Sequence, residues 1–447
     1  MPATSRHARD DTPATSARDL AARVLTAQAA RFPEIEAVEL DTSRLDDREA
    51  ALAHALYDAA IRRWLTLEWL LTRKLSRPFR ELEPALRAAL LIGAAQLVLF
   101  DRIPVHAAID EAVEWAKRRI RPGAGSIVNA VLRKVASDLG ERTDTPNDAD
   151  IPLDEQSART FIGDWPADQL HAVAARYSMP PQLIRRWRKD LSRRDVLDIC
   201  THGLTRPPTI LNTRHQSRPL PADTIEPHRH EHHALWTGSH QSLGQMLADR
   251  GDVWVQDPAS SGSIDSIRGM SPTVIGDLCA GQGTKTRQLA ATFAQAAIVA
   301  TDTDRTRFAA LRQTFRGDER VRVLPPHEAS KALAGAADLI LLDVPCSNTG
   351  VLGRRVEARY RCTRAALERL TGIQRQLIAD SVPLLAPKGR ILYATCSIEQ
   401  SENDQITAWA AQWHRFRPDF VRRTLPTAHS GPASSVDGSF STLLTRG

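Results

Sequence analysis

The chain has 447 residues, more than one ordinary domain holds, and suggests two or three domains. Hydrophobic residues make up 42%, which is enough for sizeable cores, but the longest apolar run, 85–100, contains Arg87 and Gln96 and therefore indicates a buried helix and excludes a membrane span. The net charge of +6 permits a polyanionic partner without requiring one. Five cysteines without disulfide-like spacing, and a polar N-terminus without an apolar signal segment, predict a cytoplasmic protein.

The first third of the chain has a helical pattern. Residues 1–15 are polar and predicted to be disordered, and Ser16 can cap the first helix. Apolar spacing remains helical to about residue 140, and the run 85–100 is apolar almost all round, so it is predicted to be the central helix of an all-α bundle. Arg133 and Lys134 belong to a basic edge that suits phosphates, although a solvated helix face explains any one of them equally well.

The middle of the chain carries weaker signals. Residues 141–165 are acidic and aperiodic and are predicted to be a linker. Residues 166–250 are predicted to form a connector subdomain of short helices with a basic face and an extended strand. The histidine-rich stretch 228–233 lacks the spacing that a tetrahedral metal site requires, so we predict no metal there.

A glycine-containing turn follows a predicted strand at 273–278, and a helix follows the turn. Such a turn allows close backbone approach and presents the positive end of a helix dipole. A second strand, 297–301, ends at Asp302, where a carboxylate suits a ribose diol. The pattern predicts a nucleotide-type cofactor and leaves NAD and S-adenosylmethionine open. The turn consists of Cys279, Ala280, Gly281, Gln282, Gly283, Thr284 and Lys285.

Two cysteines stand at the ends of predicted strands. The apolar run 339–342 is typical of a buried strand and ends at Asp343, with Cys346 just beyond it. A second strand, 390–394, is followed by Cys396. Open α/β sheets hold their ligands at strand ends, so both thiols are expected at the edge of one pocket. One free cysteine is usually a buried core residue, but two in this pattern indicate a sulfur nucleophile.

From about residue 16 to about 403 the chain resembles one family of bacterial 16S ribosomal RNA (cytosine-5)-methyltransferases. RIPVHAAIDEAVEWAK (102–117) and VNAVLRK (128–134) resemble the NusB-like RNA-binding domain that precedes the catalytic domain in this family. DLCAGQGTKT (277–286) is similar to the family's DLCAAPGGKT, with Gly-Gln-Gly-Thr in place of Ala-Pro-Gly-Gly. DVPCS (343–347) and ATCSI (394–398) match its two cysteine motifs.

The resemblance implies an all-α N-terminal bundle (16–140) and, over 251–447, a class I methyltransferase core with a doubly wound, seven-stranded, mostly parallel α/β sheet. It implies S-adenosylmethionine as cofactor and ribosomal RNA, of the small subunit, as partner, and we expect a monomer. By the same resemblance Cys396 is the nucleophile and Cys346 assists product release. Asp343 is the acid facing the cytosine or the cofactor, with Lys285 beside the site.

The resemblance also implies cofactor contacts along the turn from Cys279 to Lys285 and at Asp302 and Asp343. After its third strand the family has a Gly-Asp pair, where this chain has Pro-His-Glu, and we assign His327 to the cofactor site. The predicted RNA contacts are Arg354, Arg355, Arg133 and Lys134.

Two other functions fit parts of the pattern. One is an RNA-binding ribosome-assembly or antitermination factor whose methyltransferase core has degenerated, which the altered glycine turn favours and the intact thiol motifs oppose. The other is a methyltransferase that acts on transfer RNA. The helical N-terminal domain favours ribosomal RNA over the latter.

Overall fold

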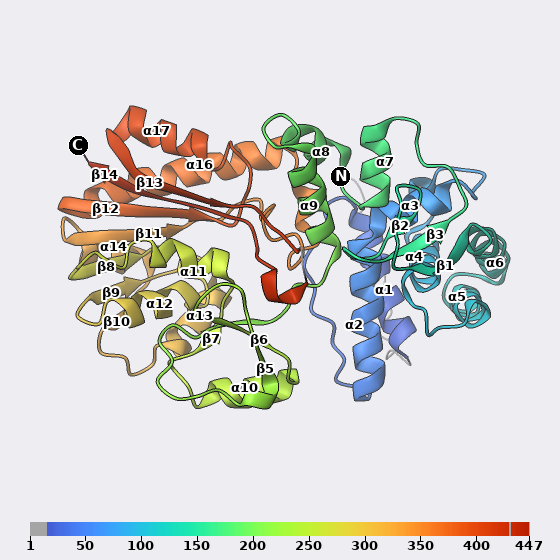
Figure 1. Cartoon of the computed structure of the whole chain (residues 1–447), viewed down its shortest axis with the longest axis horizontal. Coiled ribbons are helices and arrows are strands. Elements are labelled where there is room, and N and C mark those ends of the chain that lie inside the picture. Colours follow the sequence, from blue (N-terminus) through green and yellow to red (C-terminus); the bar gives the residue numbers. More distant parts are fainter. Residues whose placement is uncertain (1–15, 429–430, 447) are drawn as a thin grey trace, which may run out of the picture. The chain divides into compact units, whose positions relative to one another are not determined.

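The computed structural model describes residues 16–428 and 431–446, and the chain divides into two compact units, one ending at Pro181 and the other beginning at Gln182 (Figure 1). The stretch predicted to be disordered, 1–15, lies outside the described residues. Within those residues, no helix has both the length and the apolar character needed to cross a membrane.

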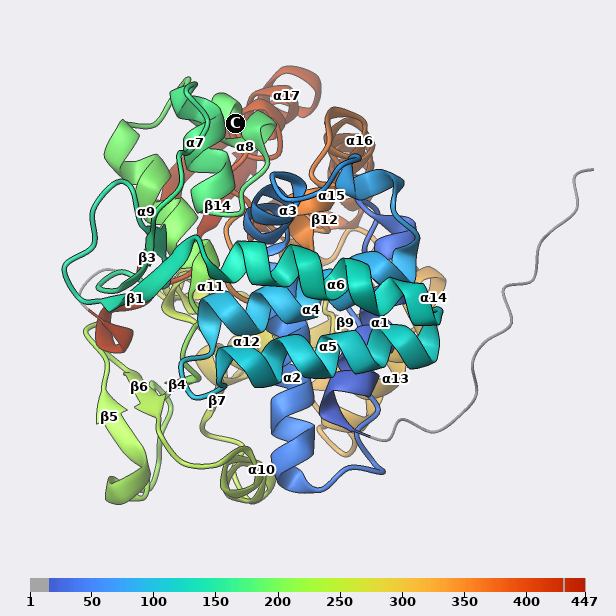
Figure 2. The ribbon, with the colours of Figure 1, turned by 90° about the vertical axis from the view of Figure 1, so that its right-hand side faces the viewer.

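The first unit is a helical bundle, as predicted. Its central helix, α4, begins with Pro84 and is buried along almost its whole length, because apolar residues cover every face. Ser16 caps α1 by accepting a hydrogen bond from the Asp19 N–H. Figure 2 shows α4, α5 and α6 side by side. The helices are α1 (Ala17–Arg31), α2 (Asp47–Arg62), α3 (Trp64–Thr72), α4 (Pro84–Leu99), α5 (Val105–Arg119), α6 (Pro122–Ala136) and α7 (Gln169–Arg176), with a 3-10 turn at Phe79–Glu81.

The structure corrects the predicted linker. The segment after α6 forms an antiparallel sheet in the order β1-β3-β2, made of β1 (Leu139–Thr143), β2 (Ile151–Pro152) and β3 (Ala158–Phe161). Buried Arg159 donates to the Val98 carbonyl at 3.1 Å, and Trp165 stacks on Trp69 with 4.5 Å between ring centroids. These strands have only two to five residues each, so their apolar spacing carries no signal, and they are held by packing against the bundle.

The second unit begins with helices and a small antiparallel sheet. Its strands occur in the order β5-β6-β4-β7, and Trp236, Leu211 and Val253 contribute to the core beneath them. The elements are α8 (Pro181–Trp187), α9 (Arg193–Leu204), β4 (Ile210–Asn212), a 3-10 turn (Ala222–Thr224), β5 (Ile225–Pro227), β6 (His233–Trp236), α10 (His240–Ala248), β7 (Trp254–Val255) and α11 (Pro258–Asp265).

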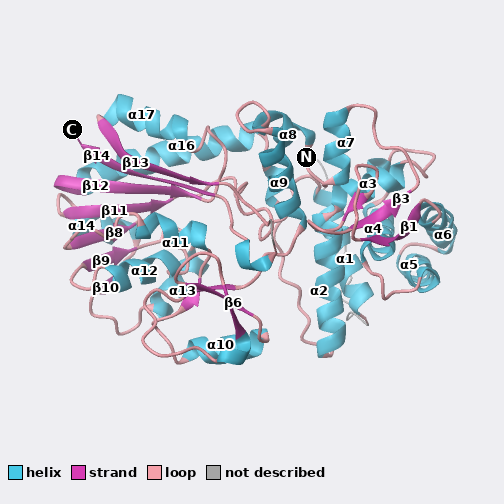
Figure 3. Ribbon diagram, viewed as in Figure 1, coloured by secondary structure: helices cyan, strands magenta, loops and turns pink. Residues whose placement is uncertain are grey.

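The rest of the second unit is the doubly wound domain. Among the described residues its sheet has seven strands in the order β10-β9-β8-β11-β12-β14-β13, parallel up to β12 and antiparallel beyond it (Figure 3). This confirms the predicted fold class. The strands are β8 (Val274–Asp277), β9 (Ala297–Ala300), β10 (Val321–Val323), β11 (Ala337–Asp343), β12 (Leu385–Thr395), β13 (Phe416–Thr424) and β14 (Ser439–Arg446); the helices are α12 (Thr284–Thr292), α13 (Arg305–Thr314), α14 (Pro326–Leu333), α15 (Ala358–Arg361), α16 (Arg364–Ser381) and α17 (Asp404–His414), with 3-10 turns at Val382–Leu384 and Pro432–Ser434.

Both faces of this sheet are covered, and β11 illustrates why. Leu339 and Leu341 pack with residues of α11, α12 and α13, whereas Ile340 and Leu342 pack with residues of α14, α16 and α17. An unbroken apolar run is therefore what a central parallel strand requires. The chain runs outward from β8 through β9 to β10 and then returns to place β11 beside β8, which creates a topological switch point at the carboxyl ends of the strands.

Candidate active site

A cavity of about 770 Å³ lies at this switch point. Its volume falls in the range of roughly 300–1,000 Å³ that is common for small-molecule sites. Loops that follow four adjacent parallel strands line it, namely Leu278–Gln282 after β8, Asp302–Asp304 after β9, the loop from Asp343 to Asn348 after β11, and Thr395–Cys396 after β12.

The two predicted thiols meet at this cavity. Parallel pairing aligns the ends of β11 and β12, and the Gly350 N–H holds their loops together by donating to the Cys396 carbonyl at 2.9 Å. As a result the Sγ atoms of Cys346 and Cys396 lie 3.2 Å apart. Cys346 is buried, whereas Cys396 is partly exposed to the cavity. The hydrogen bond to Cys396, together with burial, holds the pKa of the Cys346 thiol well above its usual range.

A buried carboxylate, Glu402, connects the residues that follow the two thiols. Its Oε1 accepts from the Ser347 N–H at 2.9 Å and from Gln374 Nε2 at 3.0 Å. Its Oε2 accepts from the hydroxyls of Ser347 and Ser397, the latter at 2.6 Å. Burial raises the pKa of Glu402. Because each oxygen has two donors, this side chain fixes both cysteine loops in one arrangement.

Lys285 and Asp343 form an ion pair on another wall of the cavity. Lys285 lies in the first turn of α12, and its Nζ donates to Asp343 Oδ2 at 2.8 Å. Burial is the largest single influence on the pKa of Lys285 and lowers it. The charge and hydrogen bond of Asp343, together with the neighbouring Cys396 and Asp277, outweigh burial and raise that pKa, so the ammonium group stays charged. The pair presents a cation and a carboxylate to whatever occupies the cavity.

Both glycines of the turn at 279–285 have a left-handed backbone conformation. Gly281 and Gly283 have φ of +58° and +94°, a region that favours glycine, and a Cβ at Gly281 would project into open space. Asp302 Oδ2 accepts from the Gly281 N–H at 2.9 Å, so the carboxylate at the end of β9 faces the turn. Buried Asp277 accepts from Thr286 Oγ1 at 2.7 Å and joins β8 to α12. A helix N-terminus, an open glycine turn and a neighbouring carboxylate fit the nucleoside part of a cofactor.

Comparison with known proteins identifies the class of this site. The model of the NusB family matches residues 15–137, and the model of the 16S rRNA methyltransferase RsmB/F family matches residues 270–421. The chain therefore carries a NusB-like region followed by a region that is similar to the RsmB/F methyltransferases. A protein of Erwinia tasmaniensis named ribosomal RNA small subunit methyltransferase B is 29% identical over 378 residues, covering 80% of each chain. The Yersinia pestis protein of that name is 27% identical over 407 residues, covering 89% of this chain and 90% of its own.

Solved structures share the fold. The crystal structure of PH0851 superposes with a TM-score of 0.70 at 22% identity and covers 95% of this chain and 98% of that one. A methyltransferase homolog from Pyrococcus horikoshii gives a TM-score of 0.50 at 19% identity, covering 63% of this chain and 99% of its own. These two structures show the fold of the chain and do not by themselves indicate its function.

Most of the predicted cofactor residues line the cavity, with two exceptions. Gly283 lies beneath it, where Phe315 and Leu311 pack against its Cα. His327 lies in the first turn of α14, and its side chain is 70% exposed and faces Glu328. The structure therefore does not bring His327 to the site, because Pro326 starts a helix there. Thr303, Asp304 and Arg307 line the corresponding part of the cavity beyond β9.

The predicted RNA-binding arginines of this domain differ in their partners. Arg354 Nε donates to Asp437 Oδ2 at 2.6 Å, and its terminal nitrogen lies 3.3 Å from Asp257 Oδ2, so this guanidinium is already engaged with two carboxylates. Burial and the charge of Asp437 raise the pKa of Asp257 to about 7. Arg355 also lines the cavity and is exposed. It is the better placed of the two arginines for a phosphate.

Arg133 and Lys134 belong to the other unit. Both are exposed in the last turn of α6, and Arg133 Nε donates to Asn129 Oδ1 at 2.9 Å. Cationic side chains in the last turn of a helix are also stabilised by the helix dipole, so their position has a structural explanation as well.

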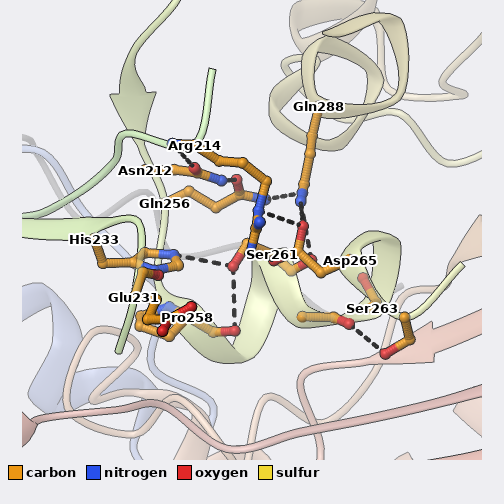
Figure 4. A network of polar contacts seen from close by, with 12 residues as sticks. Asn212, Arg214, Glu231, His233, Gln256, Pro258, Ser261, Ser263, Asp265 and Gln288 are labelled. Carbon is orange, nitrogen blue, oxygen red and sulfur yellow. Dashed lines mark hydrogen bonds and ion pairs between the residues drawn. The ribbon is translucent and has the colours of Figure 1, made fainter. Parts of the chain in front are cut away.

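A buried polar network supports α12 from behind the cavity (Figure 4). Gln288 of α12 accepts from Gln256 Nε2 at 2.7 Å and donates to the Ser261 carbonyl at 2.9 Å. His233 Nε2 lies 3.0 Å from Ser261 Oγ, and burial lowers the pKa of His233 to about 4. A second histidine of the 228–233 stretch, His228, bonds the Ser435 carbonyl at 3.0 Å. These two rings serve as hydrogen-bonding partners in the packed interior.

Sequence reasoning missed three contributors to the site. They are Glu402, Asn348 and the pairing of Asp437 with Arg354. No local pattern could have revealed the long-range contacts of these residues. Glu402 bonds Ser347 across 55 positions, Asn348 bonds Cys396 across 48, and Arg354 and Asp437 are 83 positions apart. The one available signal was polarity. Glu402 and Asn348 follow buried strands closely in the sequence, and buried polar side chains rarely lack a hydrogen-bond partner.

Proposed function

We propose that the protein transfers a methyl group from S-adenosylmethionine to carbon 5 of a cytosine in small-subunit ribosomal RNA. The match of residues 270–421 to the RsmB/F family model and relatives named ribosomal RNA small subunit methyltransferase B support the reaction and the substrate. The observation that carries the mechanism is the thiol pair, with Cys396 partly exposed in the cavity and Cys346 Sγ 3.2 Å from its sulfur.

The thiol pair suits covalent catalysis. Carbon 5 of cytosine is too weak a nucleophile to accept a methyl group unaided. When the Cys396 thiolate adds to carbon 6, a sulfur–carbon bond forms and the ring becomes an enamine that is nucleophilic at carbon 5. S-adenosylmethionine, when bound, supplies the methyl group as an electrophilic sulfonium. A base, which can be a water in the cavity, then takes the carbon-5 proton. The electrons of that carbon–hydrogen bond restore the ring double bond, and the bond to Cys396 breaks with its electron pair leaving on sulfur.

The neighbours of Cys396 have separate roles in this scheme. Because its pKa is raised, Cys346 remains a thiol, and its S–H is placed to donate to the Cys396 sulfur as that sulfur departs. Lys285 and Asp343 offer a donor and an acceptor to the polar edge of the base. The target cytosine must be unpaired or extruded to reach the sulfur.

The glycine turn, the N-terminus of α12 and Asp302 would hold the cofactor. The turn departs from the family sequence at Gln282 and Thr284, but Gly281 and Gly283 keep left-handed φ values and Asp302 is bonded to the turn. These φ values and the hydrogen bond of Asp302 weigh against a degenerate methyltransferase core. Arg355 in this unit, and Arg133 and Lys134 in the other, are proposed phosphate contacts.

The test is methyl transfer to unmodified transcripts. Wild type and Cys396→Ala are each mixed with radiolabelled S-adenosylmethionine and either small-subunit ribosomal RNA or a transfer RNA pool, and digested nucleosides are separated to locate the label. We expect label in 5-methylcytidine from ribosomal RNA with wild type, and a rate reduced at least about 10³-fold for Cys396→Ala, the scale of loss for a covalent nucleophile.

Three results would contradict the proposal. Transfer by Cys396→Ala at the wild-type rate rules out the mechanism. Label confined to transfer RNA replaces the substrate with the second alternative. RNA binding without any cofactor binding would support the degenerate-core interpretation.

A further inference from the structure

Asn348 stands between the two thiols. It is the second residue after Cys346, in the loop that follows β11, and it lines the cavity. Its φ is +60°, in the left-handed region that asparagine tolerates better than most residues other than glycine. This backbone conformation turns the loop so that the carboxamide reaches the end of β12.

Two hydrogen bonds fix the orientation of this carboxamide. Asn348 Nδ2 donates to the Cys346 carbonyl at 3.0 Å. The Cys396 Sγ donates to Asn348 Oδ1 at 3.0 Å. The first bond determines which end of the amide faces the sulfur, since a carbonyl oxygen can be approached only by a donor. Asn348 therefore presents an acceptor to Cys396.

The contact with Asn348 determines which of the two thiols donates a hydrogen bond to the other. If the proton of Cys396 points to Asn348, the lone pairs of its sulfur remain for the cavity and for Cys346, which lies 3.2 Å away. Cys346 must then be the donor in the sulfur–sulfur contact. The raised pKa of Cys346 agrees with this direction, because a thiol that donates to its neighbour keeps its proton. In the opposite direction Cys396 would donate to Cys346 and its lone pairs would be turned from the cavity.

We propose that Asn348 is a catalytic residue that selects Cys396, and not Cys346, as the nucleophile by holding the hydrogen-bond chain of the two thiols in one direction. The inference rests on the proposed function, in which Cys396 Sγ is the reacting atom. Asn348 touches that atom directly.

A purely conformational role predicts something different. If asparagine is present only because the loop needs a left-handed residue, Asn348→Gly should preserve the backbone and leave the thiols unchanged. If the carboxamide acts on Cys396, the glycine variant keeps the loop and loses the effect. Asn348→Asp keeps the shape of the side chain but places negative charge beside the sulfur and removes the donor to Cys346.

The experiment measures thiol reactivity in the full-length protein without RNA or cofactor. Each variant is alkylated with iodoacetamide from pH 6 to pH 10, and the modified cysteine is identified by mass spectrometry. We expect wild type to react at Cys396. For Asn348→Gly we expect the ratio of Cys396 to Cys346 alkylation at pH 7.5 to fall about tenfold, because the two thiols are no longer held in one direction. Asn348→Asp should in addition slow Cys396 alkylation, because its negative charge opposes a neighbouring thiolate.

Methyl transfer provides the second readout. Both variants should lower kcat about 10-fold or more, with the KM for S-adenosylmethionine within about threefold of wild type, because a group that acts on the nucleophile affects the chemical step. Arg415→Gly is the matched control, since Arg415 has φ of +58° at the exposed end of α17, far from this loop in sequence. It should change neither alkylation nor kcat.

The outcomes separate this inference from the proposed function. If Asn348→Gly melts like wild type and matches it in both alkylation profile and kcat, the inference is overturned. If methyl transfer proves independent of Cys396 while the alkylation profile of Asn348→Gly still shifts, the proposed mechanism fails but the contact remains. A folded Asn348→Gly that keeps the wild-type ratio of Cys396 to Cys346 alkylation also contradicts the inference.

Discussion

The two ends of the cavity are built in different ways. At the β11 and β12 end, side chains hold side chains: Glu402 bonds Ser347 and Ser397, and Asn348 contacts Cys396. At the β8 and β9 end, backbone conformation dominates, and Asp302 bonded to the Gly281 N–H is the main side-chain contribution at the turn. The network around Gln288 holds α12, whose first turn borders that end of the cavity.

This difference suits what each end is proposed to do. A nucleophile must be held within a few tenths of an ångström of its productive position, which a dense buried network achieves. The ribose and the other polar groups of a nucleoside cofactor need backbone donors and space, which glycines and a helix N-terminus supply. Substitutions at the thiol end should therefore affect the rate and the fold, whereas those at the turn should affect cofactor affinity.

The largest effect is expected at Glu402. Glu402→Ala removes the acceptor of the buried Ser347 N–H and one acceptor each from the Ser347 and Ser397 hydroxyls and the Gln374 amide. We expect a loss of about 2–4 kcal/mol in the free energy of unfolding and about 100-fold in kcat. Denaturant unfolding and single-turnover transfer measure the two. Glu368→Ala, an exposed glutamate of α16, is the control, and an active, equally stable Glu402→Ala contradicts this account of the thiol end.

A smaller effect is expected at Asp302. Asp302→Ala removes the acceptor of the Gly281 N–H and the carboxylate proposed for the ribose. The KM for S-adenosylmethionine should rise about 10- to 50-fold with kcat within about threefold, because a binding contact is lost and not a transition-state contact. Glu319→Ala, an exposed residue between α13 and β10 that does not line the cavity, should change KM less than about twofold. Equal losses in both variants would overturn this assignment of Asp302.

The smallest effect concerns the support behind α12. The pKa of His233 is lowered by burial from 6.5 to about 4, so below pH 6.5 the unfolded chain takes up a proton that the folded chain refuses. Stability should therefore fall as the pH falls from 6.5 to 4. Relative to His233→Gln, wild type should lose about 2–3 kcal/mol across that range, with transfer at pH 7.5 little changed. The free energy of unfolding of both proteins is measured at pH 7.5 and at pH 4.5. An equal loss in wild type and His233→Gln would contradict this role of His233.

Sequence reasoning predicted the local parts of this molecule well. The apolar run 339–342, the turn at 279–285 and the position of Cys396 after a strand each depend on neighbouring residues, and the structure has those elements where they were expected. The resemblance added the order of the domains. The core could be anticipated because β11 must be apolar on both faces to lie between two layers of helices.

What could not be predicted depends on distant contacts. Arg354 was expected to be free for RNA, but Asp257 and Asp437 approach it from 97 and 83 positions away. His327 was assigned to the cofactor by its position after a strand, whereas Pro326 starts a helix that turns it outward. The strands β1 to β3 form only because the bundle offers a surface to pack on. Such contacts follow from tertiary structure and leave no periodicity in the sequence.

The central claim is that Cys396 bonds to the target cytosine and that Cys346 helps it to leave. It is tested most directly by incubating end-labelled small-subunit ribosomal RNA transcript and S-adenosylmethionine with Cys346→Ala, Cys396→Ala and wild type, and separating the products on a denaturing gel. We predict an RNA–protein adduct that survives denaturation with Cys346→Ala and no adduct with Cys396→Ala. An adduct of equal yield with Cys396→Ala, or methylation by that variant at the wild-type rate, would contradict the claim.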